Sequence, residues 1–133
     1  MDRRRLALIG LVVAAALFLG GLLLGGSGRT EAETARDQAE LQLNLERARV
    51  SILQGRMALV GLNFGEASQQ FDASRAPLQA ARDRLNAVGR TEEAGRVSAA
   101  LNSVVQAQEL TLAVDRSADA KAVEALGAIQ GIQ

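Results

Sequence analysis

The sequence of 133 residues contains no cysteine, histidine, tryptophan or tyrosine. Without cysteine the chain has no disulfide, no thiol nucleophile and no thiolate metal site. Without histidine it lacks the commonest general base and the commonest ligand of transition metals. The remaining reactive groups are carboxylates, hydroxyls, arginines and a single lysine, Lys121. This composition predicts a protein that is not an enzyme and that uses no cofactor and no metal.

The chain also lacks an excess of charge of either sign, because it carries 15 basic and 15 acidic residues. Arg3, Arg4 and Arg5 stand together beside Asp2, which leaves 12 basic and 14 acidic residues for the rest of the sequence. A nucleic-acid-binding surface needs a basic patch, and the slightly acidic remainder offers none. We therefore expect no nucleic acid among the partners.

One long apolar run is present near the N-terminus. The stretch from Leu6 to Gly28 holds 23 residues without a charge, and about 20 apolar residues span a bilayer core as a helix. The apolar region of a secretory signal peptide is shorter, about 7–15 residues. We therefore predict an uncleaved transmembrane signal anchor over residues 6–25, with a cleaved signal as the alternative.

Small residues recur along one face of this span. Gly21 and Gly25 form a GxxxG unit, which lets two helix backbones approach closely. The residues expected on this packing face are Gly10, Ala14, Gly21 and Gly25. The alternative is that the face contacts only lipid.

The charges that flank the span predict its orientation. Three arginines precede it, whereas Arg29, Glu31 and Glu33 follow it as a mixed set, and basic residues stay on the cytoplasmic side. We expect the protein in a bacterial inner membrane, with the N-terminus in the cytoplasm and the C-terminal domain in the periplasm. The predicted parts are a basic tail (1–5), the anchor (6–25), a linker and helical stalk (26–40) and a helical domain (41–133).

Apolar residues after the span recur at helical spacing, and no stretch alternates as a strand does. The GGSG segment at 25–28 predicts a flexible joint, followed by a long helix that Thr30 caps. Later helices are expected after Phe64, over 91–114 and over 118–129. Pro77 should cause a kink or a short break near residues 72–76 in the first of these, and Gly89 should end it. The fold class is therefore all-α, with about four helices in the domain. The expected buried stripes are Leu41, Leu45, Ala48, Ile52, Leu59 and Leu62; then Ala94, Val97, Leu101, Val104, Val105, Gln108 and Leu112; then Ala122, Val123, Leu126 and Ile129.

The segment from Gly55 to Phe71 resembles a single tetratricopeptide-type helical hairpin. Gly55, Phe64, Ala67 and Phe71 stand at the spacing at which that family packs small residues against each other beside two aromatic rings. The resemblance implies that Leu62 packs with these four residues to close the hairpin. The whole layout is also similar to small bacterial proteins built from one membrane helix and a short helical periplasmic domain.

Hydroxyl and lysine side chains offer little for catalysis. Ser68 lacks the flanking glycines of a nucleophile elbow, so it is expected in the first turn of a helix. Ser117 and Lys121 are four residues apart, where a serine–lysine motif of the β-lactamase type needs three. We expect Ser117 to cap a helix and Lys121 to face solvent.

Two further groups allow more than one interpretation. The acid pairs Glu92–Glu93 and Asp115/Asp119 are explained by their places at helix starts, rather than by metal binding. Phe64 and Phe71 either line an apolar ligand groove or fill the core, and their size favours the core.

Together these features predict a non-catalytic, membrane-anchored helical protein that acts in protein interaction, as a scaffold or accessory subunit on the periplasmic side. Its partner would be another protein or a second copy of itself. The alternatives are a periplasmic helical ligand-binding domain and a secreted helical protein released by signal cleavage.

Overall fold

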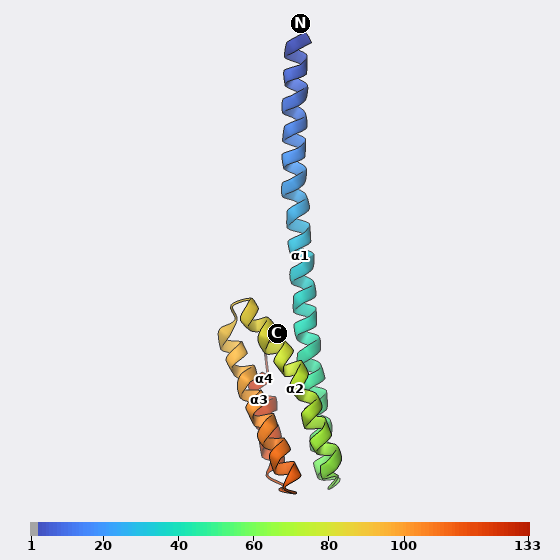
Figure 1. The fold of residues 1–133 in the computed structure, drawn as a ribbon, viewed down its shortest axis with the longest axis vertical. Coiled ribbons are helices and arrows are strands. Elements are labelled where there is room, and N and C mark those ends of the chain that lie inside the picture. The colour runs from blue at the N-terminus through green and yellow to red at the C-terminus, as the bar shows by residue number, and fades with distance from the viewer. Residues whose placement is uncertain (1–2) are drawn as a thin grey trace. The chain divides into compact units, whose positions relative to one another are not determined.

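The computed structural model describes the backbone of residues 3–133 and the side chains of residues 30–133. The chain divides into two units, residues 1–36 and residues 37–133. Within the described residues it forms four α-helices and no strand (Figure 1). The prediction of an all-α fold is confirmed. The helices are α1 (Arg3–Val60), α2 (Phe64–Ala87), α3 (Thr91–Leu112) and α4 (Ala118–Ile129).

The N-terminal part of α1 differs from the expected break. Residues 25–28 are helical, and Thr30 lies inside α1 instead of capping it; the Thr34 hydroxyl donates to the Thr30 carbonyl at 2.7 Å. A glycine weakens a helix by about 1 kcal/mol without necessarily interrupting it. The predicted span 6–25 lies outside the residues whose side chains are described, and so does its packing face of Gly10, Ala14, Gly21 and Gly25. Within the part that is described, no helix is both long and apolar enough to cross a membrane.

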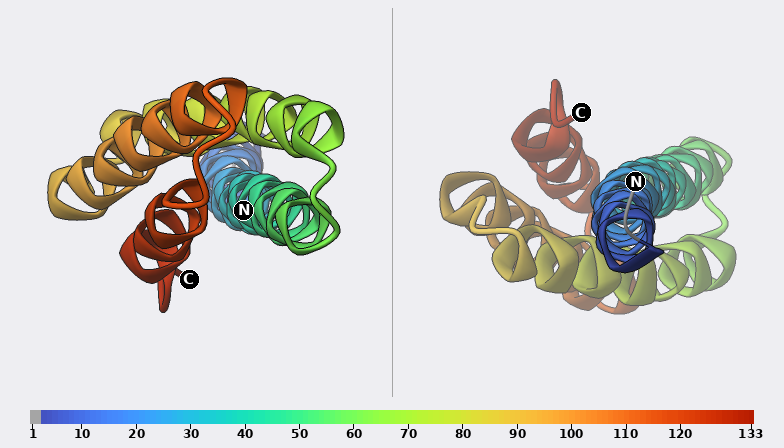
Figure 2. Two further views of the ribbon diagram at one scale, coloured as in Figure 1. Left: turned by 90° about the horizontal axis from the view of Figure 1, so that it is seen from below. Right: turned by 90° about the horizontal axis from the view of Figure 1, so that it is seen from above.

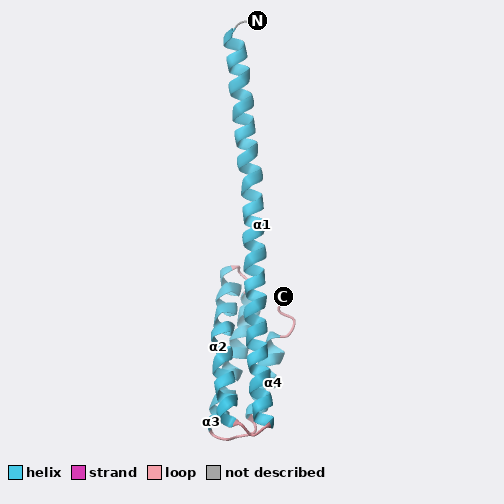
Figure 3. Ribbon diagram, turned by 90° about the vertical axis from the view of Figure 1, so that its right-hand side faces the viewer, coloured by secondary structure: helices cyan, strands magenta, loops and turns pink. Residues whose placement is uncertain are grey.

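Residues 37–133 form an antiparallel bundle. The C-terminal part of α1 runs in one direction, α2 returns, α3 runs parallel to α1 and α4 returns again (Figures 2 and 3). All four helices contribute to one apolar core, which includes the fully buried Leu45, Ile52, Phe71, Leu78, Leu85, Val97, Val104 and Ile129. Each chain reversal is short, so sequential helices become antiparallel neighbours.

The contact between Gly55 of α1 and Phe71 of α2 determines how closely these two helices approach. The Phe71 ring is fully buried. A Cβ atom on Gly55 would lie only 2.7 Å from the ring atom Cε1 of Phe71. The absence of a side chain at position 55 therefore creates the space that the ring fills.

The buried face of α1 agrees with the predicted stripe except at its end. Leu41, Leu45, Ala48, Ile52 and Leu59 are buried, whereas the Leu62 side chain is 56% exposed. The helix ends at Val60, so the helical spacing no longer applies to Leu62.

The stripes predicted for the last two helices are partly wrong. On α3 the buried positions include Ala100, Ala107 and Thr111, while Leu112 is 70% exposed. On α4 the alanines at 118, 122 and 125 are buried and Val123 is exposed. Small side chains let packed helices approach closely, and the buried alanines of α3 and α4 supply surfaces of this kind.

Pro77 does not break α2, contrary to one of the two expected outcomes. The helix continues from Phe64 to Ala87 and curves along its length (Figure 1). Pro77 has no N–H to donate to the carbonyl of Ala73. Because Ala73 is exposed, water can bind that carbonyl. The buried Ser74 hydroxyl donates to the Phe71 carbonyl at 2.7 Å.

Arginines from two helices hold the end of α4. Arg49 of α1 donates through Nη2 to the Ile129 carbonyl at 2.9 Å, and Arg96 of α3 donates through Nε to the Ala128 carbonyl at 3.0 Å. The last carbonyls of a helix have no intrahelical donor, and cations near them are favourable. These bonds attach a helix of only 12 residues to its two neighbours.

We predict that Phe71→Ala lowers the free energy of unfolding by about 3–5 kcal/mol, because the substitution empties a closed core site. Gly55→Ala should also destabilise, by about 1–3 kcal/mol, because its methyl group overlaps the ring. Urea unfolding followed by circular dichroism measures both. In the double variant Gly55→Ala/Phe71→Ala the two losses should be less than additive, because the methyl group no longer meets a ring. Strict additivity would show that the ring and Gly55 are not in contact.

Candidate functional site

A second apolar face lies on α1, in addition to the face that enters the core. Five large apolar side chains on this helix are between 46% and 84% exposed: Leu43, Val50, Leu53, Met57 and Val60. We call this set the outer face of α1. Its members follow one another at steps of seven, three, four and three residues, which is the spacing of a helix seam.

The position of the outer face follows from helix geometry. Residues two apart on an α-helix point about 200° apart around its axis. Leu43 and Val50 each precede a buried core residue, Leu45 and Ile52, by two positions. The outer face therefore points away from the bundle, so no helix within residues 37–133 covers it.

One acidic residue interrupts the outer face. Glu46 forms an ion pair with Arg49 one turn further along α1. Arg49 is in turn bonded to the Ile129 carbonyl of α4. The charge of Glu46 is thus compensated within the bundle, and the surrounding surface stays apolar.

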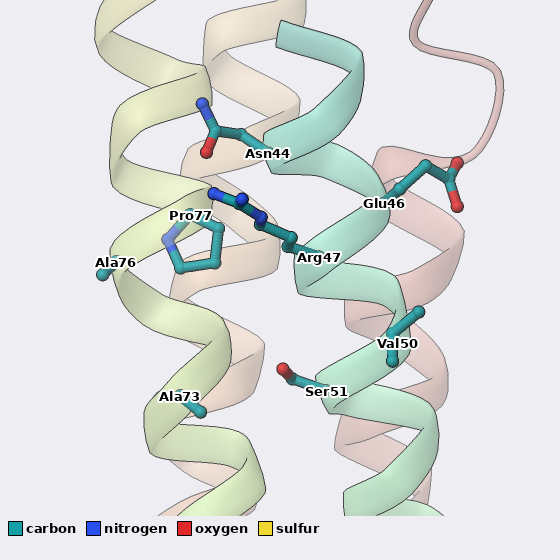
Figure 4. Close-up of a pocket in the computed structure, with 8 residues that line it drawn as sticks. All are labelled: Asn44, Glu46, Arg47, Val50, Ser51, Ala73, Ala76 and Pro77. Carbon is teal, nitrogen blue, oxygen red and sulfur yellow. The ribbon is translucent and has the colours of Figure 1, made fainter. Parts of the chain in front are cut away.

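A groove of about 650 Å³ runs between α1 and α2. Figure 4 shows Asn44, Arg47 and Ser51 extending from α1 toward Pro77 of α2. The opposite wall consists of small side chains, Ala73 and Ala76, and the shortness of these side chains leaves the space open.

Three polar side chains of this groove have no hydrogen-bonding partner in the part of the protein that the structure describes. Among the described residues, the side chains of Asn44, Arg47 and Ser51 make no hydrogen bond or ion pair with the chain. The groove thus presents hydrogen-bonding groups and one cation to solvent. Arg47 is itself exposed, so the groove is a surface depression and not an enclosed pocket of the kind that buries small ligands.

The predicted hydroxyl, lysine and acid residues occupy structural positions. The Asp115 carboxylate accepts from the backbone N–H and the hydroxyl of Ser117, both at 2.8 Å, and these bonds hold the pKa of Asp115 below its usual value. Lys121 pairs with Glu124 at 2.9 Å. The Asp119 carboxylate accepts from Nε of Arg56 at 2.6 Å, and this hydrogen bond raises the pKa of Arg56.

Ser117 occupies the expected N-cap position of α4, but its hydroxyl makes no capping bond to the helix. Ser68 is the fifth residue of α2, so it lies in this helix as expected but just beyond the first turn. Glu93 forms an ion pair with Arg90, which lowers the pKa of Glu93. Within residues 30–133, no three acidic side chains gather as metal ligands would.

The structure brings together most of the residues expected to pack in the α1–α2 hairpin. Ala67 and Phe71 are fully buried, Phe71 lies against Gly55, and Phe64 is partly buried against the core. Leu62 is the exception, since its side chain projects from the turn. Asn63 caps α2 by accepting from the Glu66 N–H at 3.2 Å.

Three helices end in the same backbone motif but with different residues. In each, two N–H groups beyond the helix bond back to its last turn, with one residue in the left-handed conformation. That residue is Gly89 after α2, but Leu62 after α1 and Val114 after α3, both at φ 58°. The bonds are Leu62 N to Leu59 O and Asn63 N to Ala58 O; Gly89 N to Asn86 O and Arg90 N to Leu85 O; Val114 N to Thr111 O and Asp115 N to Leu110 O.

The use of Leu62 and Val114 at these positions is unfavourable for the backbone. The left-handed conformation costs an L-residue about 1–2 kcal/mol, and a β-branched residue adopts it rarely. Both side chains are exposed, so core burial does not offset this cost.

The outer face and the apolar turns were not identified from the sequence. The signal for the outer face is present, because Leu43, Val50 and Met57 recur at seven-residue steps. Its residues stand two positions from those of the core-facing stripe, so the two faces overlap along the same stretch of sequence. Nothing in the sequence indicates that the turns at Leu62 and Val114 share one end of the bundle.

The chain matches no family model, no curated protein and no solved structure.

We predict that Val114→Gly raises the free energy of unfolding by about 1 kcal/mol, because glycine adopts the left-handed conformation without steric cost. The same substitution at the exposed Val123, inside α4, should lower it by about 1 kcal/mol. Thermal and urea unfolding of the two variants measure the contrast. Equal destabilisation by both would contradict a strained backbone at Val114.

Proposed function

We propose that this protein is a non-catalytic, membrane-anchored interaction module, whose outer face of α1 docks a helix of another protein on the periplasmic side. The observation that supports the proposal most directly is that α1 is apolar on two opposite faces, while the bundle covers only one. Soluble domains rarely expose contiguous apolar surface without a binding role.

The dimensions of the outer face suit a helix as the occupant. From Leu43 to Val60 it extends about 25 Å along α1, at 1.5 Å per residue. Exposed side chains at steps of three, four and seven residues form the seam into which a second helix inserts its own apolar side chains. The polar α1–α2 groove lies beside this seam and shares Val50 and Glu46 with it.

The position of Glu46 favours a different protein over a second copy of this chain. In a parallel pair of α1 helices, Glu46 would stand opposite Glu46 of the other copy, and like charges in a seam are unfavourable. An antiparallel pair would avoid this repulsion, and the crosslinking experiment below distinguishes that arrangement from a different partner. We therefore propose an accessory-subunit role.

Membrane attachment rests on the sequence. The uncharged run from Leu6 to Gly28 and the three arginines before it support a signal anchor with the domain in the periplasm. The resemblance to a tetratricopeptide-type hairpin is part of the same proposal. It is supported by the packing of Phe71 against Gly55 and by the burial of Ala67.

A photocrosslinking amino acid at position 53, in the full-length protein in native membranes, should form a crosslink to a different polypeptide. Placed at Asn102, an exposed position on α3, it should not. Leu53→Glu should reduce co-purification of the crosslinked protein at least tenfold, since it buries an unpaired charge in the seam. Asn102→Glu adds the same charge and should leave co-purification unchanged. If position 53 formed crosslinks only to a second copy of this chain, the protein would self-associate through this face, and the accessory-subunit role would be wrong.

The anchor is tested separately. The protein should remain in the membrane pellet after alkaline carbonate extraction, and its intact mass should include residues 1–25. Leu17→Arg places a charge in the span, at a cost of about 2.5–3.5 kcal/mol for insertion, and should shift protein to the soluble fraction. Recovery of a shortened, soluble wild-type chain would instead indicate signal cleavage.

A further inference from the structure

A separate hollow lies at one end of the bundle, where the α1–α2 turn and the α3–α4 turn meet. Figure 3 shows both turns at the same end, opposite the turn between α2 and α3. The hollow has a volume of about 290 Å³. We call it the tip hollow; it is lined by Leu59, Val60, Leu62, Phe64, Arg116 and Asp119.

The turns that form this end differ from the turn at the other end in a way that folding alone does not explain. The α2–α3 turn places Gly89 in the left-handed position, as backbone energetics favour. The two turns at the tip hollow place Leu62 and Val114 there, although both side chains remain exposed. Strained residues retained at the surface are typical of binding sites. The apolar side chains at this end therefore point to a binding role, because they do not stabilise the fold.

The two charged residues that line the hollow differ in their partners. The Asp119 carboxylate is engaged by the guanidinium of Arg56. Arg116 makes no side-chain hydrogen bond or ion pair with any described residue. An apolar wall from one hairpin thus shares the hollow with a guanidinium from the other that is bonded to no described residue.

We propose that the tip hollow binds the C-terminal residue of a partner polypeptide, with an aliphatic side chain in the hollow and the α-carboxylate on Arg116. The volume lies at the lower end of ligand sites, about 300–1,000 Å³, which suits one residue and not a long segment. A C-terminal aliphatic residue carries its apolar group and its carboxylate on the same Cα. Guanidinium and carboxylate form paired, charge-assisted hydrogen bonds.

This inference does not depend on the outer face of α1. The two surfaces meet only at Val60, and the tip hollow draws its cation from the α3–α4 turn. A variant that abolishes docking at the outer face, Leu53→Glu, should leave the tip hollow intact. Failure of one proposal is therefore distinguishable from failure of the other.

The test uses the full chain in detergent micelles with ¹³C-labelled leucine and valine methyl groups. N-acetyl-leucine supplies the aliphatic side chain with a free carboxylate, and N-acetyl-leucinamide supplies the same side chain without it. N-acetyl-leucine should shift the methyl signals of Leu59, Val60 and Leu62 saturably. The amide should bind about tenfold more weakly, as expected for loss of a charge-assisted hydrogen bond.

Two variants complete the design. Arg116→Gln should reduce the affinity for the acid to that for the amide, while the amide is unaffected. Leu62→Gly removes part of the apolar wall and relaxes the backbone, so it should weaken both ligands in a chain that folds at least as well.

Three results would overturn the proposal. The first is an equal response to acid and amide. The second is broadening of the Leu62 methyl signals by nitroxide-labelled lipid in phosphatidylcholine nanodiscs, which would identify a bilayer contact. The third is broadening that depends only on protein concentration, which would identify a second copy as the occupant.

Discussion

The close approach of α1 and α2 at Gly55 is the constraint on which the rest of the domain depends. Because the Phe71 ring occupies the space beside Gly55, α1 can present only one rotation to its neighbour. That rotation directs Leu45 and Ile52 inward and, two positions away, Leu43 and Val50 outward. The same contact therefore builds the core and exposes the outer face. A larger residue at position 55 would separate α1 from α2. It would therefore alter both the core face and the outer face of α1.

Local signals in the sequence predict the helix limits well. The helix expected over 118–129 is observed over those residues, and Gly89 ends the second helix as a left-handed glycine does. Burial was harder to predict, because it depends on the partner helix. Val105 and Leu112 are more hydrophobic than Ala107, yet Ala107 is fully buried and Leu112 is exposed. The prediction of a flexible joint at 25–28 was wrong for a different reason. Glycine lowers helix propensity but does not by itself end a helix.

The two candidate sites differ in how far sequence could reveal them. The outer face belongs to a single helix, so its period was present in the sequence and only its coexistence with a core face concealed it. The tip hollow joins Leu62 to Arg116, which are far apart in the chain, and only the antiparallel topology places them at one end (Figure 3). From the sequence, Asp119 could pair with the nearby Arg116. In the structure Asp119 instead accepts from Arg56 of α1, and this leaves Arg116 without that partner. An ion pair between two helices depends on how the helices pack, and the sequence alone does not specify that packing.

The attachment of α4 has a consequence for which substitutions the end of this helix tolerates. Arg49 and Arg96 bind backbone carbonyls, which every amino acid supplies. Substitutions at 128–130 therefore leave these acceptors in place, so the two bonds themselves do not constrain which side chains stand there. Because a backbone acceptor does not change with the side chain, a contact map inferred from correlated substitutions would miss this link between α1 and the end of α4. Such a map would show α4 as more loosely attached to α1 than the structure does.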